Sequence, residues 1–114
     1  MEGNLAISSK EQKGVTVVSF GGRLDAVTAP GAEEKLASMI GAGSHKLLLD
    51  FRGVEYLSSA GMRMLLAITK KLRGVDGKLV LCMVNDNVMD VFKMSGFDHL
   101  LDITKDADEG LSRF

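Results

Sequence analysis

The sequence predicts an α/β fold in which helices pack against a mixed β-sheet, with the elements in the order β-β-α-β-α-β-α-β-α. Three observations predict this fold. Two strand-like segments joined by a glycine turn open the chain, which is typical of a hairpin. The run KLLLDF at 46–51 has the composition of a strand that is buried on both faces. Segments with helical spacing alternate with the later strands, and such alternation indicates helices packed against a sheet.

The hairpin comes first. Its strands are expected over residues 5–9 and 15–20, and the second is rich in β-branched residues. The Gln12–Gly14 stretch suits the turn between them. Glycines follow directly in the run GGRLD at 21–25, so we expect the second strand to stop there.

The first helix is expected to begin at Thr28, which can cap it, with Pro30 in its first turn. Glu33 and Glu34 suit the positive end of the helix dipole. An apolar stripe with helical spacing follows: Ala32, Leu36, Met39 and Ile40. The glycines at 41 and 43 predict its end.

The remaining elements follow in alternation. After the strand at 46–51, the longest helix starts at the Ser58-Ser59 pair and ends near Gly74. A turn at 76–77 leads to a strand over 78–84, then to a helix over 85–94 that stops at 95–96. A short strand over 100–103 comes last, and Thr104 is expected to cap a final helix whose first turn is acidic.

Composition narrows the function classes. The 114 residues suit a single domain over 1–114, and the net charge of −1 without a basic stripe argues against nucleic-acid binding. A single cysteine, Cys82, is consistent with a reducing compartment. The sequence carries neither a signal-peptide pattern nor a long apolar span, so we expect a cytoplasmic protein without membrane contact. Nothing resembles a coiled-coil seam, and a monomer is expected.

The helix after Ser58 has an unusual outer face. At about 100° per residue, its apolar stripe of Gly61, Met64, Leu65, Ile68 and Leu72 is expected to face the sheet. The other side carries Ser59, Met62, Arg63, Leu66 and Lys70. Two interpretations of Met62 and Leu66 stay open: a neighbouring helix covers them, or they form a partner-binding patch around Ser59.

Ser59 itself has two interpretations. A serine at a helix N-terminus is usually a cap for an unpaired backbone N–H. The same place also suits a phosphate, because the free N–H groups and the helix dipole stabilise an anion. Phosphorylation would add roughly two negative charges there without melting the helix.

Three sequence runs resemble those of the STAS domains, and in particular the bacterial anti-sigma factor antagonists. The run LLLDFRGVEYLSSAGMRMLL is similar to the family signature, in which an apolar strand leads to a serine-rich tripeptide, a glycine and an apolar helix. GGRLDAVTAPGAEEKL resembles the upstream family segment, and VFKMSGF resembles the downstream one. The three lie in the family order and cover nearly the whole chain.

The resemblance implies a partner-switching mechanism. The unphosphorylated antagonist binds an anti-sigma factor and frees a sigma factor, which regulates transcription. The anti-sigma factor is also a serine kinase, which phosphorylates the antagonist and releases it, and a metal-dependent phosphatase restores the binding form. Aligned by its glycine, the family phosphoserine falls on Ser59. Asp25 and Thr28 match family positions that contribute to kinase contact, and Met62, Arg63 and Leu66 would complete the docking surface with Ser58.

Two positions depart from the family pattern. Many members have aspartate before the phosphorylated serine, where this chain has Ser58, so Ser58 is a competitor for the phosphate. They often have a hydroxyl residue after it, where this chain has Ala60.

Other chemistry is less well supported by the sequence. His45 and His99 lack ligand-like spacing to Cys82 or to a carboxylate pair, so neither a metal nor another cofactor is expected. No nucleophile elbow, P-loop or dinucleotide fingerprint is present, and we do not expect an enzyme. The alternative function is a STAS domain that binds a small ligand or nucleotide, or scaffolds a signalling complex, without phosphorylation. Ligand binding predicts a pocket at the Ser59 end of the helix, whereas partner switching predicts an exposed apolar face.

Overall fold

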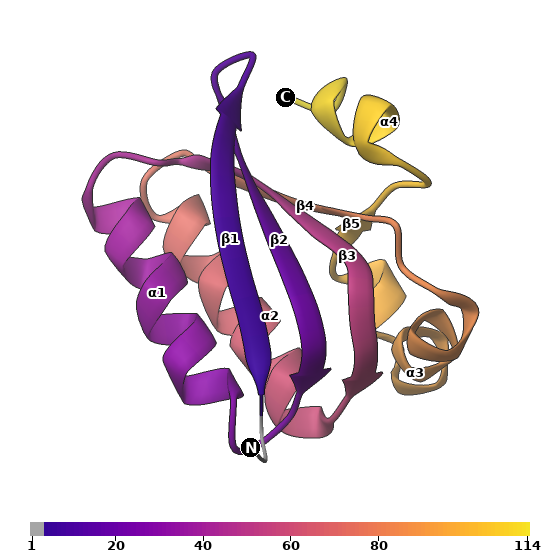
Figure 1. Ribbon diagram of the computed structural model, residues 1–114. Coiled ribbons are helices and arrows are strands. Elements are labelled where there is room, and N and C mark those ends of the chain that lie inside the picture. The colour runs from indigo at the N-terminus through magenta and orange to yellow at the C-terminus, as the bar shows by residue number, and fades with distance from the viewer. Residues whose placement is uncertain (1–3) are drawn as a thin grey trace.

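The computed structural model describes residues 4–114 and confirms the predicted α/β fold with a mixed sheet (Figure 1). Residues 1–3, on which the signal-peptide expectation partly rests, lie outside the described residues. The strands are β1 (Leu5–Gln12), β2 (Val15–Leu24), β3 (Lys46–Leu57), β4 (Lys78–Cys82) and β5 (Asp102–Ile103). The helices are α1 (Ala29–Gly41), α2 (Ser59–Arg73), α3 (Asp86–Ser95), the 3-10 turn η1 (Phe97–His99) and α4 (Ala107–Leu111).

The sheet has the strand order β1-β2-β3-β4-β5. β1 pairs antiparallel with β2 as the predicted hairpin, and every later pair is parallel. Parallel neighbours end at the same edge of a sheet, so the segments that follow β2 and β3 emerge side by side. This edge lies at the bottom of Figure 1, where α2 begins and the chain turns into α1.

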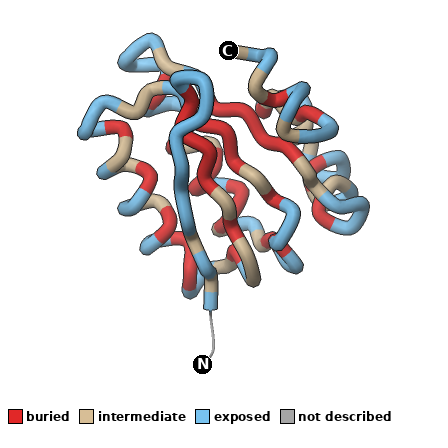
Figure 2. The backbone as a smooth tube through the Cα atoms, turned by 45° about the horizontal axis from the view of Figure 1, so that its top comes forward, coloured by how far each residue is buried: buried red, intermediate tan, exposed pale blue. Residues whose placement is uncertain are grey.

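Two apolar clusters hold the layers together. The larger lies between one face of the sheet and helices α1, α2 and α3. The smaller lies on the other face, where α4 and the C-terminal residues cover Val15, Val17, Leu48, Val80 and Cys82. Figure 2 shows the buried positions concentrated on the central strands, while β1 is largely exposed. Because residues 47–49 contribute to both clusters and are fully buried, the prediction of a strand buried on both faces is confirmed.

The first three strands are longer than the sequence predicts. β2 does not stop at Gly21 but continues to Leu24, with shifts in register where it pairs with β3. Gly22 has φ +119°, and a Cβ there would lie 2.6 Å from the Asn4 carbonyl oxygen. The glycine therefore lets the strand continue through an irregular stretch that another residue would block. β3 likewise extends to Leu57, directly before Ser58.

Two predicted caps are wrong in detail. Thr28 stands at the N-cap of α1, but its side chain makes no cap hydrogen bond, since its hydroxyl donates to the Arg23 carbonyl oxygen at 2.7 Å. The cap of α4 is Asp106, whose carboxylate accepts from the Glu109 backbone N–H at 2.9 Å. Thr104 is buried instead and donates to the Leu81 carbonyl oxygen.

Other bounds also move. β4 ends at Cys82 and not at residue 84, because Met83 has φ +59°, which no strand residue adopts. The last strand is only Asp102–Ile103, since the 3-10 turn η1 precedes it. Glu33 and Glu34 lie beyond the first turn of α1, so they are too far along to stabilise its N-terminus strongly.

Candidate functional site

Ser58 and Ser59 lie where β2 and β3 end together. The Ser58 backbone N–H donates to the Leu24 carbonyl oxygen at 3.0 Å, which ties the start of α2 to the end of β2. Gly61 makes this approach possible, since a Cβ there would lie 2.8 Å from the same carbonyl oxygen and 2.8 Å from Leu57. The structure thus brings the Asp25–Thr28 loop beside the Ser58-Ser59 pair.

The two serines occupy different positions. Ser58, and not Ser59, is the N-cap of α2: it is half-buried, has extended backbone, and its hydroxyl oxygen accepts from the Gly61 N–H at 3.4 Å. Ser59 is the first helical residue and is exposed. Within residues 4–114 its hydroxyl makes no hydrogen bond. The cap and the free hydroxyl therefore belong to two neighbouring residues.

The loop after β2 is held by its own side chains. One carboxylate oxygen of Asp25 accepts from the backbone N–H groups of Val27 at 3.0 Å and Thr28 at 3.1 Å. The Thr28 hydroxyl accepts in turn from the Asp25 N–H at 3.0 Å. Partial burial raises the pKa of Asp25, but the hydrogen bonds from Thr28, Val27 and Arg23 outweigh it and hold that pKa below its ordinary value. Asp25 and Thr28 thus shape the loop, and Thr28 is itself buried.

Two exposed side chains near this loop were not singled out from the sequence. Val27 at the tip of the loop is 72% exposed, and Tyr56 at the end of β3 is 44% exposed. The Arg23 guanidinium lies 4.3 Å over the Tyr56 ring, and its Nε lies 3.4 Å from the Asp25 carboxylate. The available signal was weak: Val27 is an apolar residue in a turn, and Tyr56 is the only tyrosine. Large exposed apolar side chains are a common feature of protein contact surfaces.

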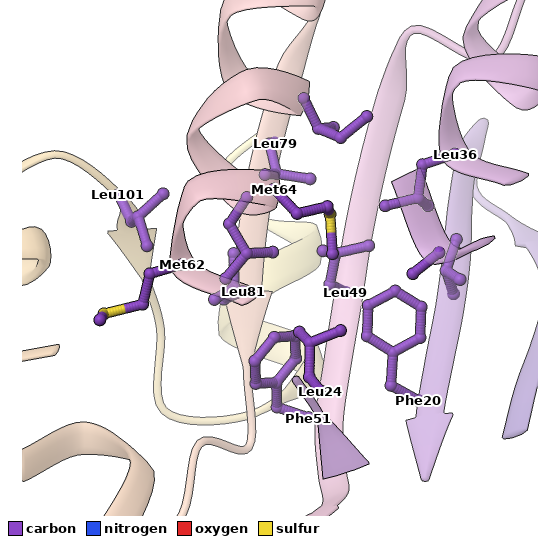
Figure 3. Close-up of a cluster of buried hydrophobic side chains, with 14 of the residues drawn as sticks. Phe20, Leu24, Leu36, Leu49, Phe51, Met62, Met64, Leu79, Leu81 and Leu101 are labelled. Carbon is purple, nitrogen blue, oxygen red and sulfur yellow. The ribbon is translucent and has the colours of Figure 1, made fainter. Parts of the chain in front are cut away.

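Met62 does not lie on that surface. It is 8% exposed and belongs to the larger cluster, and the Ser95 hydroxyl of α3 lies 3.4 Å from its sulfur. Figure 3 shows Met62 at the edge of this cluster, while Met64 points into it. Of the two interpretations that the sequence left open for Met62, the structure bears out the first, since the neighbouring helix α3 covers this side chain. Leu66 is half-buried against the same cluster, and Arg63 is exposed.

A groove opens beside the same end of α2. It has a volume of about 670 Å³, lies between α1 and α2, and is lined by Ala26 of the loop and by Ala60 and Arg63 of α2, among others. We call it the α1–α2 groove. The surroundings of Ser59 thus include an exposed apolar loop, as partner switching predicts, and a groove, as ligand binding predicts.

The other candidate groups remain apart. Residues 4–114 contain no cluster of three or more histidine, cysteine or acidic side chains that would hold a metal ion. Cys82 is fully buried, and burial followed by the nearby Asp50 charge raises its pKa to about 11. None of the helices in the described part of the chain is long and apolar enough to cross a membrane.

Comparisons with known proteins point to one family. The family model described as STAS domain matches residues 6–110. BtrV of Bordetella bronchiseptica, whose name places it with the anti-sigma factor antagonists, is 32% identical over 89% of this chain and 87% of its own length. An anti-sigma-B factor antagonist of Staphylococcus epidermidis is 28% identical over 90% of this chain and 94% of its own.

A solved structure agrees with these relatives. The crystal structure of an anti-sigma factor antagonist from Mycobacterium paratuberculosis superposes with a TM-score of 0.89 at 25% identity, covering 99% of this chain and 96% of that one. The chain therefore has a known fold, and the resemblance expected from the sequence is confirmed. The chain belongs to the STAS domain family, among the relatives named as anti-sigma factor antagonists.

Proposed function

We propose that this protein is an anti-sigma factor antagonist whose binding is switched by phosphorylation of Ser59. The observation that carries the proposal is the exposed, unbonded hydroxyl of Ser59 at the first position of α2, beside the ordered loop that presents Val27. Relatives that bear the name anti-sigma factor antagonist over nearly the full chain support it.

The start of α2 suits a phosphate on Ser59. In the transfer, the hydroxyl oxygen attacks the γ-phosphorus of ATP, the bond to the β-phosphate oxygen breaks to release ADP, and the hydroxyl proton passes to a base of the kinase. The first N–H groups of a helix have no partner within it, so they and the helix dipole stabilise the new charge. The phosphoprotein therefore keeps its fold while its surface gains roughly two negative charges.

Ser59 is a better acceptor than Ser58. The Ser58 hydroxyl is half-buried and faces the Gly61 N–H as the cap of α2. Phosphorylating it would remove a cap that stabilises a helix by about 1 kcal/mol. The Ser59 hydroxyl is exposed and has no such role, so a kinase reaches it without disturbing the helix.

The proposed contact surface differs from the one expected from the sequence. Arg63, Val27 and Tyr56 are exposed around Ser59 and contact the partner, an anti-sigma factor that is also the serine kinase. Asp25 and Thr28 act by holding the loop. A metal-dependent phosphatase removes the phosphate, and the protein itself is a regulatory binding protein of the cytoplasm and not an enzyme.

Phosphosite mapping tests the proposal. The protein is incubated with the anti-sigma-type kinase encoded nearest to it, ATP and magnesium, and the phosphate is located by mass spectrometry. Ser59→Ala is compared with Ser58→Asn, because asparagine retains a capping oxygen and so leaves α2 intact. We expect phosphate on Ser59, lost in Ser59→Ala and kept in Ser58→Asn.

The other outcomes are equally informative. Phosphate on Ser58 would keep the switch but move its site by one residue. A folded protein that takes up no phosphate from any candidate kinase, and binds none of them, would contradict the proposal and favour the ligand-binding or scaffold alternative.

A further inference from the structure

The α1–α2 groove has a floor of small side chains. Figure 1 shows the two helices side by side on the same face of the sheet. Four alanines, two from each helix, line the groove over the buried Met64: Ala29, Ala37, Ala60 and Ala67. Because alanine side chains are small, the side chains of another helix can pack into the groove between α1 and α2.

The two rims carry opposite charges. Glu33 and Glu34 line the groove from α1, whereas Arg63 and Lys71 line it from α2. Among the ion pairs of residues 4–114, none includes any of these four side chains. An acidic rim thus faces a basic rim across an apolar floor, and both rims are free to pair with an incoming molecule.

The shape favours a helix over a small molecule. Small-molecule sites usually enclose about 70–90% of the ligand and contain a few buried polar groups that orient it. This groove is open to solvent, and its charged side chains stand on the rims. The 15 residues of α2 span about 22 Å at 1.5 Å per residue, which accommodates roughly four turns of a partner helix with apolar anchors.

We propose that the α1–α2 groove receives an amphipathic helix of the anti-sigma-type partner. The apolar stripe of that helix lies on the alanine floor, its basic flank faces Glu33 and Glu34, and its acidic flank faces Arg63 and Lys71. The inference rests on the proposed function, and it names the surface that holds the partner.

The same placement links the groove to the switch. Ala60 lines the groove directly after Ser59, and Arg63 lies one helical turn further along. A phosphate on Ser59 would therefore stand at the end of the basic rim, next to the acidic flank of the bound helix. Repulsion between like charges releases the helix, while the phosphate can pair with Arg63 instead.

A matched pair of charge reversals tests this inference. Lys71 and Lys70 are adjacent, exposed and on the same helix, but only Lys71 lines the groove. The dissociation constant of the full-length kinase, loaded with ADP, is measured by calorimetry for Lys71→Glu and Lys70→Glu. We expect Lys71→Glu to weaken binding by about 10-fold or more and Lys70→Glu to change it by less than about 2-fold. Ala67→Leu, which fills the floor, is expected to weaken binding as well, with circular dichroism to check the fold.

The outcomes separate the inference from the proposed function. If the two lysine variants had equal effects on binding and Ser59 were still phosphorylated, the groove would not be the binding site of the partner helix. The proposal that phosphorylation of Ser59 acts as a switch would be unaffected. A kinase that neither binds nor phosphorylates the wild type would overturn both. Sedimentation is the further check. If the protein formed a dimer and Lys71→Glu abolished it, the groove would bind a second copy of this chain, which would contradict the proposed binding of a partner helix.

Discussion

Replacing Met62 with alanine decides whether this residue belongs to the core or to the docking surface. Met62 is 8% exposed, contacts the larger apolar cluster and lies against Ser95 of α3. Buried methionine-to-alanine changes usually cost 2–5 kcal/mol, and the position of Met62 at the cluster edge puts the expected loss at about 2–3 kcal/mol. For a domain of this size, that loss lowers the melting temperature by about 8–12 °C.

Urea denaturation is the assay. The midpoint should fall for Met62→Ala while the slope stays unchanged, because the surface exposed on unfolding is nearly the same. Arg63→Ala is the matched control, since Arg63 is the next residue and is exposed, and we expect it to stay within about 0.5 kcal/mol of the wild type. At a temperature where both variants are folded, Met62→Ala should bind the kinase within about 3-fold of the wild type.

The opposite pattern would refute the reasoning. If Met62→Ala were as stable as the wild type within about 0.5 kcal/mol and bound the kinase much more weakly, Met62 would be a surface contact. Its burial beneath α3 would then be wrong, and the interpretation of Met62 as part of a partner-binding patch would stand.

Three further predictions follow from the site and its surroundings. Gly61→Ala, which would stabilise an ordinary helix, should instead cost about 1–3 kcal/mol by calorimetry, because its Cβ would meet the Leu24 carbonyl oxygen at 2.8 Å; a stabilised variant would contradict the close contact. Asp25 has a folded pKa below the ordinary 3.8, so its contribution to stability is present above pH 3.8 and is lost as pH falls through the folded value. The melting temperature of the wild type should therefore exceed that of Asp25→Asn at neutral pH by more than it does near pH 3, and a constant difference would contradict this. Cys82, fully buried and with its pKa raised to about 11, should not react with a thiol reagent at pH 8 until urea unfolds the chain; rapid labelling of the folded protein would show that the face under α4 is open.

Periodicity predicted much of the fold. The stripe of α2 that the sequence assigned to the sheet is buried at each of its positions, since spacing alone decides which side chains share a helix face. The end of α2 at Gly74 and the end of α3 at Gly96 also agree. At Gly96 the backbone is left-handed, with φ +79°, a conformation that favours glycine.

The features that the sequence missed or left open depend on contacts between distant segments. Met62 lies outside the stripe that faces the sheet, and only the packing of α3, some thirty residues later, buries it. The continuation of β2 past Gly21 depends on pairing with β3, which a local pattern does not contain. Tyr56 and Val27 become neighbours of the site only once β2 and β3 end together, and the side-chain bonds of Asp25 hold the loop that exposes Val27.

The affinity of the phosphorylated protein for its kinase tests the central claim most directly. The protein is phosphorylated to completion on Ser59, freed of the enzyme and titrated by calorimetry into ADP-loaded kinase, with the untreated protein and Ser59→Ala as references. The account predicts that the untreated protein and Ser59→Ala bind alike, and that the phosphoprotein, with an unchanged circular dichroism spectrum, binds about 100-fold more weakly or worse, a difference of about 2.8 kcal/mol. Equal affinities for the phosphorylated and unphosphorylated forms would contradict it, because the charge on Ser59 would then not act as a switch.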